Sequence, residues 1–319
     1  MKIAFHSNQL GLRGTEVSLY NYAMYNEEVL GNESVIITFE HTNLEAKEKF
    51  SNRFETLVEP WGKYEEVLKN KHVDYLYMQK AGWNDGYSLN SIPTLIHCVF
   101  RGFQPHGYRH AFISEYLAEV ENYNPNLFCV PYLVNTLSTA SFCLREELKI
   151  PSNHVVLGYH GGEHQFSISY AKKAVERILC IREDMQFIFL NIKPWIHHPK
   201  VHFLPGTYDM DRKAAFIEAC DGMIHARADG ETFGMSIAEF AVKNKPVITQ
   251  GIAPDGAHLQ MLRDTGIYYN SEKQLYCILK DYERIIEEKR KEVGSFSKNY
   301  LKYADPEYVM NKFKFVYLQ

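Results

Sequence analysis

The feature that most constrains the fold of this chain is the order strand, glycine-containing turn, helix and strand within residues 222–249. The apolar run Gly222-Met223-Ile224-His225 predicts a short buried strand, and residues 237–242 predict an amphipathic helix. Lys245-Pro246 ends this helix before a further strand at residues 247–249. In such a βαβ unit, the loop after the first strand borders the ligand crevice, and the helix start offers unpaired N–H groups to an anion. We therefore expect a ligand that bears phosphate.

Two carboxylates flank the turn of this unit. Glu231 precedes the predicted helix, and Glu239 lies about one turn into it. Because both would repel phosphate, we expect them to bind another part of the same ligand, for which sugar or ribose hydroxyls are natural candidates. Each also has an explanation without a ligand, Glu239 as a solvent-facing helix residue and Glu231 as a carboxylate that stabilises the helix dipole.

Strand and helix patterns alternate along the rest of the chain. In the first half, the expected strands are residues 2–6, 35–39, 74–77, 94–98, 111–113 and 128–130, and the expected helices are residues 14–27, 45–53, 64–71 and 141–149. In the second half, the expected strands are residues 155–158, 187–190, 201–204 and 266–269, and the expected helices are residues 167–181, 209–220 and 271–292. Alternation of this kind favours parallel sheets covered by helices on both faces. The predicted fold class is therefore α/β, with two Rossmann-like domains that divide near Ile150-Pro151 and an active site in the cleft between them.

The residues around the two glutamates resemble the C-terminal domain of the GT-B glycosyltransferases, in particular glycosyltransferase family 4. That family carries a Glu-x7-Glu motif, matched by Glu231 and Glu239, and usually a Phe-Gly pair, matched by Phe233-Gly234. Further segments resemble the family in the same order along nearly the whole chain: Lys2-Ile3-Ala4-Phe5-His6, Gly11-Leu12-Arg13-Gly14-Thr15-Glu16, Thr94-Leu95-Ile96-His97, Ala111-Phe112-Ile113-Ser114-Glu115 and Val130-Pro131-Tyr132-Leu133-Val134-Asn135.

This resemblance implies a GT-B fold with three parts. Residues 1–150 would form an acceptor-side Rossmann-like domain, and residues 151–304 would form a Rossmann-like domain that binds a nucleotide sugar. Residues 305–319, with a helix expected at 306–316, would cross back and pack on the first domain. The implied activity is transfer of a sugar from a nucleoside diphosphate sugar to an acceptor, with retention of configuration and without a metal ion.

The resemblance also assigns roles to individual residues. Glu239 would accept hydrogen bonds from the ribose hydroxyls, and Glu231 would act in catalysis by contacting the donor sugar and stabilising its positive charge in the transition state. The donor-binding residues of the turn would be Thr232, Phe233, Gly234 and Met235, of which the last three would use their backbone amides and Gly234 would let the backbone approach closely. The nucleotide base would lie near Pro205, Gly206, Thr207 and Tyr208.

The departing diphosphate needs cationic or N–H partners. The family commonly supplies an Arg and a Lys near the start of the second domain, but residues 158–163 contain neither. Gly161 and Gly162 in this segment remain donor-binding candidates. Lys193 and Arg227 are the expected replacements for the missing cations, and Arg227 has the alternative of pairing with Asp229 or Glu231.

Two further candidates lie in the first half of the chain. His97 ends a predicted strand, where α/β sites form, and a His in this place often lies near the donor sugar in relatives, so His97 is a catalytic candidate. Its alternative is a structural histidine with satisfied hydrogen bonds. Gly14 and Thr15 would contact the diphosphate through their amides, although Thr15-Glu16 replaces the second Gly seen in many relatives.

Composition excludes several classes of partner and site. The 319 residues carry a net charge of −4, which gives no general attraction to nucleic acid. No apolar run reaches the ~18 residues of a membrane span and no secretory signal is visible, so any membrane contact would be peripheral. The six cysteines form no C-x-x-C pair, and several lie in apolar runs as expected for buried thiols, so we expect a cytoplasmic protein. No zinc-ligand spacing is present, and we expect no metal site.

The predicted function is therefore glycosyl transfer from a UDP- or GDP-sugar, which is a substrate rather than a cofactor, to a carbohydrate or glycoconjugate acceptor. Two alternatives remain open. One is a nucleotide-sugar epimerase or hydrolase on the same fold, and the other is a catalytically silent protein that binds sugar nucleotides. A dinucleotide oxidoreductase is disfavoured because neither half has G-x-G-x-x-G after its first strand.

Overall fold

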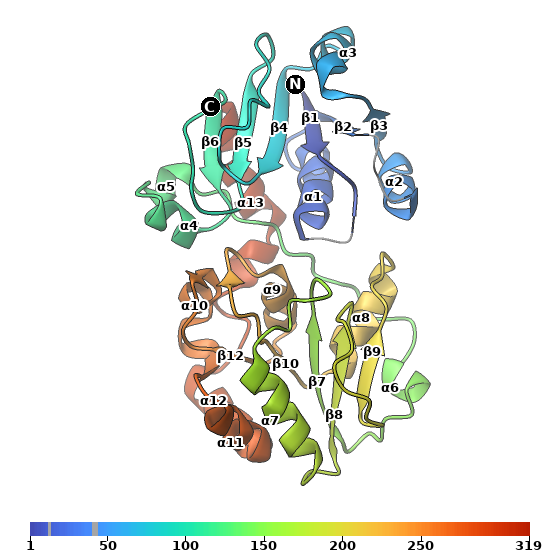
Figure 1. Ribbon diagram of the computed structural model, residues 1–319. Helices are drawn as coiled ribbons and strands as arrows, with labels where there is room; N and C mark the ends of the chain where they lie inside the picture. The colour runs from blue at the N-terminus through green and yellow to red at the C-terminus, as the bar shows by residue number, and fades with distance from the viewer. Residues whose placement is uncertain (12–13, 40–43) are drawn as a thin grey trace. The chain divides into compact units, whose positions relative to one another are not determined.

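The computed structural model describes residues 1–11, 14–39 and 44–319, with the backbone alone at residues 44 and 45. Within this range the chain divides into two compact units, Met1–Val134 together with Lys302–Gln319, and Asn135–Leu301 (Figure 1). Each unit contains a six-stranded sheet whose neighbouring strands are parallel. The α/β class and the two Rossmann-like sheets expected from the sequence are thus confirmed.

The sheet of the first unit has the strand order β3-β2-β1-β4-β5-β6. Its strands are β1 (Lys2–Ser7), β2 (Glu33–Thr38), β3 (Glu55–Val58), β4 (Tyr75–Lys80), β5 (Thr94–Cys98) and β6 (Arg109–Phe112). This is the strand order of the Rossmann fold, in which the ligand crevice opens where the order reverses. In this unit the reversal lies between β1 and β4.

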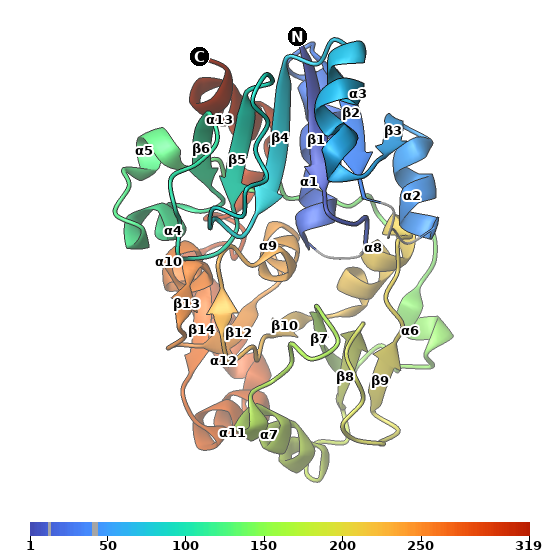
Figure 2. The ribbon, with the colours of Figure 1, turned by 45° about the horizontal axis from the view of Figure 1, so that its top comes forward.

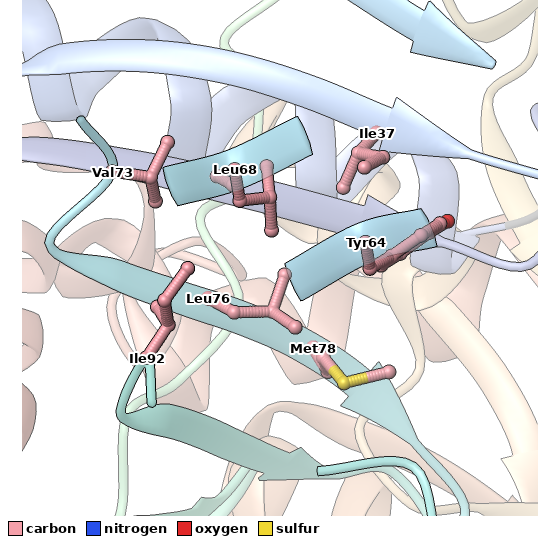
Figure 3. Close-up of a cluster of buried hydrophobic side chains, with 8 residues drawn as sticks. Ile37, Tyr64, Leu68, Val73, Leu76, Met78 and Ile92 are labelled. Carbon is pink, nitrogen blue, oxygen red and sulfur yellow. The ribbon is translucent and has the colours of Figure 1, made fainter. Parts of the chain in front are cut away.

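Helices cover both faces of this sheet. They are α1 (Gly14–Glu28), α2 (Leu44–Ser51), α3 (Tyr64–Asn70), α4 (Glu115–Val120), α5 (Pro125–Phe128) and α13 (Pro306–Phe313), with shorter turns η1 (Trp61–Lys63) and η4 (Lys314–Leu318). On one face, Tyr64 and Leu68 of α3 pack over Leu76 of β4 in a buried cluster (Figure 3). On the opposite face, the ring of Phe313 in α13 lies 6.4 Å from that of Phe5 and 5.5 Å from that of Tyr22 in α1. Both faces of a parallel sheet are therefore buried, as such sheets require.

The last residues of the chain belong to the first unit. Val134 N donates a hydrogen bond to Tyr303 O over 2.8 Å, and the Tyr317 hydroxyl donates to Ile96 O over 3.0 Å. Residues far apart in sequence therefore share one core. The unit resumes at Lys302, close to residue 305, where the sequence placed the start of the returning segment.

The second unit repeats the same topology, which can be followed in Figure 2. Its sheet has the order β14-β12-β10-β7-β8-β9, built from β7 (Val155–His160), β8 (Met185–Leu190), β9 (Val201–Leu204), β10 (Gly222–Ile224), β12 (Val247–Gln250) and β14 (Gly266–Tyr269). A separate parallel pair joins β11 (Gly230–Glu231) to β13 (Asp255–Gly256). The helices are α6 (Leu144–Glu147), α7 (Ser169–Leu179), α8 (Met210–Ala219), α9 (Met235–Val242), α10 (Ala257–Leu262), α11 (Glu272–Lys280) and α12 (Tyr282–Val293), with the turn η2 (Arg263–Thr265). The turn η3 (Leu301–Ala304) begins at the last residue of this unit and continues into the first unit. The order of this sheet reverses between β7 and β10.

The structure corrects two local expectations. Residues 128–130 do not form a strand, because Asn124 caps a helical turn that starts at Pro125 and only Cys129 bridges to the sheet. The expected helix at 271–292 is two helices, α11 and α12, which are separated by Asp281, whose backbone is not helical. Of the cysteines, Cys98, Cys129 and Cys220 are buried, as expected of several of them, whereas Cys143, Cys180 and Cys277 are exposed.

The boundary between the units also differs from the expected division near Ile150. The structure places it between Val134 and Asn135. The reason is Arg145, which lies in α6, donates through Nε to Ala219 O over 2.7 Å and pairs with Asp221 over 2.8 Å. These contacts attach the segment before β7 to the second unit.

Candidate functional site

The candidate site lies in the second unit, where the strand order reverses between β7 and β10. At such a reversal the loops after the two central strands run in opposite directions and leave a crevice at their carboxyl ends. His160 is the last residue of β7, and His225 directly follows β10. Both predicted glutamates are held by these two histidines.

Two glycines shape the turn that carries the motif. Gly230 has φ of +74°, and a Cβ at this position would lie 2.0 Å from Asp255 O of the neighbouring strand β13. Gly234, the residue before α9, has φ of +89°. An L-residue side chain would strain the backbone at both positions. The Gly-containing turn that the sequence predicted therefore determines the backbone position of Glu231.

Glu231 is buried, with an exposed fraction of 8%, and both of its carboxylate oxygens are held. His225 Nε2 lies 3.2 Å from Oε1, and Arg227 Nη1 donates to Oε2 over 2.8 Å. The other nitrogen of His225, Nδ1, lies 2.8 Å from Thr249 Oγ1. The sequence left two possible partners for Arg227, namely Asp229 and Glu231. In the structure, Arg227 pairs with Glu231.

Glu239 is almost fully buried, and its carboxylate lies between two basic groups. Lys213 Nζ of α8 donates to Oε1 over 2.5 Å, and His160 Nε2 lies 2.9 Å from Oε2. Burial by itself would raise the pKa of Glu239, but the charge of Lys213 and the contact with His160 outweigh it and lower the pKa to about 2. Burial lowers the pKa of His160. Glu239 is therefore an ionised, inward-facing residue and not the solvent-facing one that the alternative interpretation required.

Buried polar atoms without a hydrogen-bond partner gather around these two carboxylates. Among the residues that the structure describes, they include Tyr159 Oη, Arg227 Nε and both ring nitrogens of His258. His160 Nε2 and Glu239 Oε2 also lack an aligned partner, although they lie 2.9 Å apart. Because buried polar groups are nearly always satisfied in folded proteins, such a concentration is typical of a ligand site.

The diphosphate candidates lie in two loops that are hydrogen-bonded to each other. Gly161 O accepts from Asn191 Nδ2 over 2.8 Å, and Lys193 N donates to Glu163 O over 2.9 Å. Gly162 N donates to Gln165 Oε1 over 2.8 Å. The Lys193 side chain is exposed, and its ammonium forms no ion pair within the described parts of the chain. The structure thus brings Gly161, Gly162 and Lys193 to the carboxyl ends of β7 and β8.

His97 is not placed as a catalytic residue would be. It is fully buried in the first unit, and Cys98 follows it within β5. The Tyr77 hydroxyl lies 2.5 Å from Nδ1, and Nε2 lies 2.9 Å from Val130 O. Burial lowers the pKa of His97 to about 3. With both nitrogens occupied inside an aromatic core, His97 is a structural histidine, which corrects its candidacy as a catalytic residue.

The remaining candidates follow β1 in the first unit and β9 in the second. Gly14 and Thr15 form the first turn of α1, where the Thr15 hydroxyl donates to Glu16 over 2.8 Å. Leu12 and Arg13, which belong to the same predicted loop, lie outside the described residues. The base-region residues Pro205, Gly206, Thr207 and Tyr208 follow the edge strand β9 and precede α8, whose cap Asp209 donates to Thr207 Oγ1 over 3.0 Å.

Sequence reasoning missed four residues of this site: His160, Lys213, His225 and His258. His160 and His225 carried a readable signal, because each comes at the carboxyl end of a predicted strand. Lys213 and His258 carried none, since neither belongs to a motif. Within the described residues, no group of three or more His, Cys, Asp and Glu side chains could hold a metal ion. The same residues contain no helix that is both long and apolar enough to cross a bilayer.

No protein-family model and no curated protein sequence matches this chain. Solved structures do. Anabaena Alr3699/HepE in complex with UDP-glucose is 15% identical, with a TM-score of 0.68 over 99% of this chain and 98% of that one. WaaG, a glycosyltransferase involved in lipopolysaccharide biosynthesis, is 13% identical, with a TM-score of 0.68 over 99% of both chains. Sucrose-phosphate synthase from Thermosynechococcus elongatus is 12% identical, with a TM-score of 0.65 over 98% of this chain and 95% of that one. These likenesses establish the GT-B fold over nearly the whole chain.

Proposed function

We propose that this protein is a glycosyltransferase that moves a sugar from a UDP- or GDP-sugar to a carbohydrate or glycoconjugate acceptor. The observation that carries the proposal is the pair Glu231 and Glu239, both buried and both held by basic groups at the strand reversal of a GT-B fold. Among structures of this fold, HepE was solved with UDP-glucose. Retention of configuration and a family 4-like mechanism are parts of the proposal that derive from the Glu-x7-Glu resemblance.

The two glutamates take different parts of the donor in this proposal. Glu239 accepts hydrogen bonds from the ribose hydroxyls, with its charge retained by Lys213. Glu231 faces the sugar, where a fixed carboxylate stabilises positive charge that develops as the bond to the diphosphate breaks. Arg227 and His225 hold Glu231 in a single orientation, so little reorganisation is needed during the reaction.

The leaving diphosphate carries negative charge that must be offset without a metal ion in this proposal. The backbone amides of Phe233, Gly234 and Met235 at the start of α9 supply N–H donors. Lys193 supplies the cation, because its ammonium is exposed beside the loop that contains Gly161 and Gly162. Arg227 contributes less, since Glu231 already uses one of its amino groups.

The experiment that tests this function is a screen of UDP, GDP and their sugar derivatives by thermal shift, followed by product analysis. We expect one sugar nucleotide to raise the melting temperature, and its sugar to appear on an acceptor from a glycan library. Release of free sugar or a change of its configuration without transfer would identify the hydrolase or epimerase alternative. Binding without any turnover would identify a silent binding protein, and no binding would refute the proposal.

A further inference from the structure

The backbone brings His258 against the motif turn. His258 is the second residue of α10, which follows β13, and Gly256 of β13 lies opposite Glu231 of β11. A Cβ placed on Gly234 would lie 3.6 Å from the Cβ of His258. The rings of His258 and His225 lie 5.1 Å apart. His258 therefore lines the same turn as Glu231, although 27 positions separate them in the sequence.

The imidazole of His258 is fully buried, and neither of its nitrogens has a hydrogen-bond partner among the described residues. The buried histidines His97 and His225 differ, because each has a partner at both nitrogens. An unsatisfied buried polar group destabilises a fold, so its presence calls for a reason other than stability. The position beside Glu231 supplies that reason.

The chemistry of this imidazole indicates which part of a ligand it would bind. Burial is the main reason that the pKa of His258 lies well below its usual range, and the nearby His225 and Arg227 lower it further. The ring is therefore neutral. A neutral imidazole has one N–H donor and one acceptor nitrogen, which match a hydroxyl, whereas a phosphate oxygen only accepts. The surrounding charged groups, Glu231 and Arg227, are already paired with each other.

We propose that His258 is a sugar-recognition residue, whose imidazole binds a hydroxyl of the donor sugar next to the hydroxyl that Glu231 binds. This inference rests on the proposed function. Because the ring is fully buried, binding must uncover one of its nitrogens. His258 would then distinguish a sugar nucleotide from the nucleoside diphosphate that remains after transfer.

Calorimetry with two ligand pairs tests the inference: UDP with UDP-glucose, and GDP with GDP-mannose. For the pair that the wild type binds, we expect His258→Leu to raise the Kd of the sugar nucleotide about tenfold or more and to leave that of the nucleoside diphosphate within about twofold. His258→Gln, which keeps a donor and an acceptor, should recover part of the loss. If His258→Leu binds each of the two ligands with the same Kd as the wild type, the inference is wrong and the proposed function still stands. If the wild type binds none of the four ligands, both fail.

Stability separates recognition from a structural role. His258→Leu removes two unpaired buried nitrogens, so its melting temperature without ligand should equal or exceed that of the wild type. The matched control His225→Leu removes two satisfied nitrogens and should melt at a lower temperature. If His258→Leu melts at a lower temperature than the wild type and loses affinity equally for the sugar nucleotide and the nucleoside diphosphate, His258 has a structural role and the inference is wrong. In the wild type labelled with ¹⁵N-histidine, the sugar nucleotide but not the nucleoside diphosphate should shift the His258 ring nitrogens.

Discussion

Lys213 Nζ lies 2.5 Å from Glu239 Oε1, so the second glutamate of the motif is neutralised by a lysine on a different helix. The side chains are 13% and 1% exposed, respectively, which makes this a largely buried ion pair. Removing one partner of such a pair leaves the other charge buried and unpaired, which destabilises the fold more than replacing both partners with apolar residues. Substitutions of Glu239 therefore affect both stability and binding, and the two effects need separate tests.

Glu239→Ala should lower the free energy of unfolding by ~3 kcal/mol, because Lys213 keeps its charge and loses its partner. Denaturation by urea measures this change. Adding Lys213→Ala should recover part of the loss, since the unpaired charge is then removed. Stability that falls further in the double variant would contradict the buried pair.

Glu239→Gln should raise the Kd for the nucleoside diphosphate by about one to two orders of magnitude, because charge-assisted hydrogen bonds to ribose become neutral ones. Calorimetry on the folded variant measures this. Glu176→Gln, which changes an exposed glutamate on α7, is the matched control and should bind normally. Unchanged affinity in Glu239→Gln would refute the ribose assignment.

Glu231→Gln should bind the nucleoside diphosphate nearly normally and transfer sugar about a hundredfold more slowly, because its contact is with the sugar. Turnover and product affinity are measured side by side. Asp229→Asn alters an exposed carboxylate two positions earlier and serves as the control, with little effect on either quantity. A large loss of diphosphate affinity with intact turnover would exchange the roles of the two glutamates.

Lys193→Ala should lower kcat by about a hundredfold, since removing one donor to a developing anion typically costs ~2.7–4 kcal/mol. The exposed Lys173 on α7 provides a matched control, and Lys173→Ala should retain full turnover. Activity should survive EDTA. Loss of transfer in EDTA that Mg²⁺ or Mn²⁺ restores, together with an active Lys193→Ala, would show that a metal carries this charge instead.

His97 should make the stability of the protein depend on pH. Burial lowers its folded-state pKa to about 3, whereas the unfolded chain binds the proton below about pH 6.5. Between these values the unfolded state holds more protons, so stability falls as pH falls, by up to ~1.4 kcal/mol per pH unit for this residue. His97→Gln should be less stable at pH 8, because it disturbs two hydrogen bonds, but should show a shallower decline in urea midpoint from pH 8 to 5. The exposed His164→Gln should reproduce the wild-type slope.

Local sequence patterns determined the bounds of several strands, the fold class and the backbone of the motif turn. Apolar periodicity placed β5, β9 and β14 at their observed bounds and indicated the α/β class. The glycines of the motif turn determined its backbone, because positive φ at Gly230 and Gly234 is a property of the residues themselves. Such features are set by neighbours within a few positions, which a sequence displays directly.

Only the tertiary structure decided the partners of the two glutamates and the place of each histidine. Lys213 and His160 meet at Glu239, and His258 reaches Glu231, because parallel strands and their helices bring distant segments together. Burial then decided what each group can do: the same residue type is a satisfied core residue at His97 and an unsatisfied one at His258. Sequence patterns record which face of an element is apolar, but hydrogen bonding and ionisation depend on what the fold places within about 3 Å of each atom.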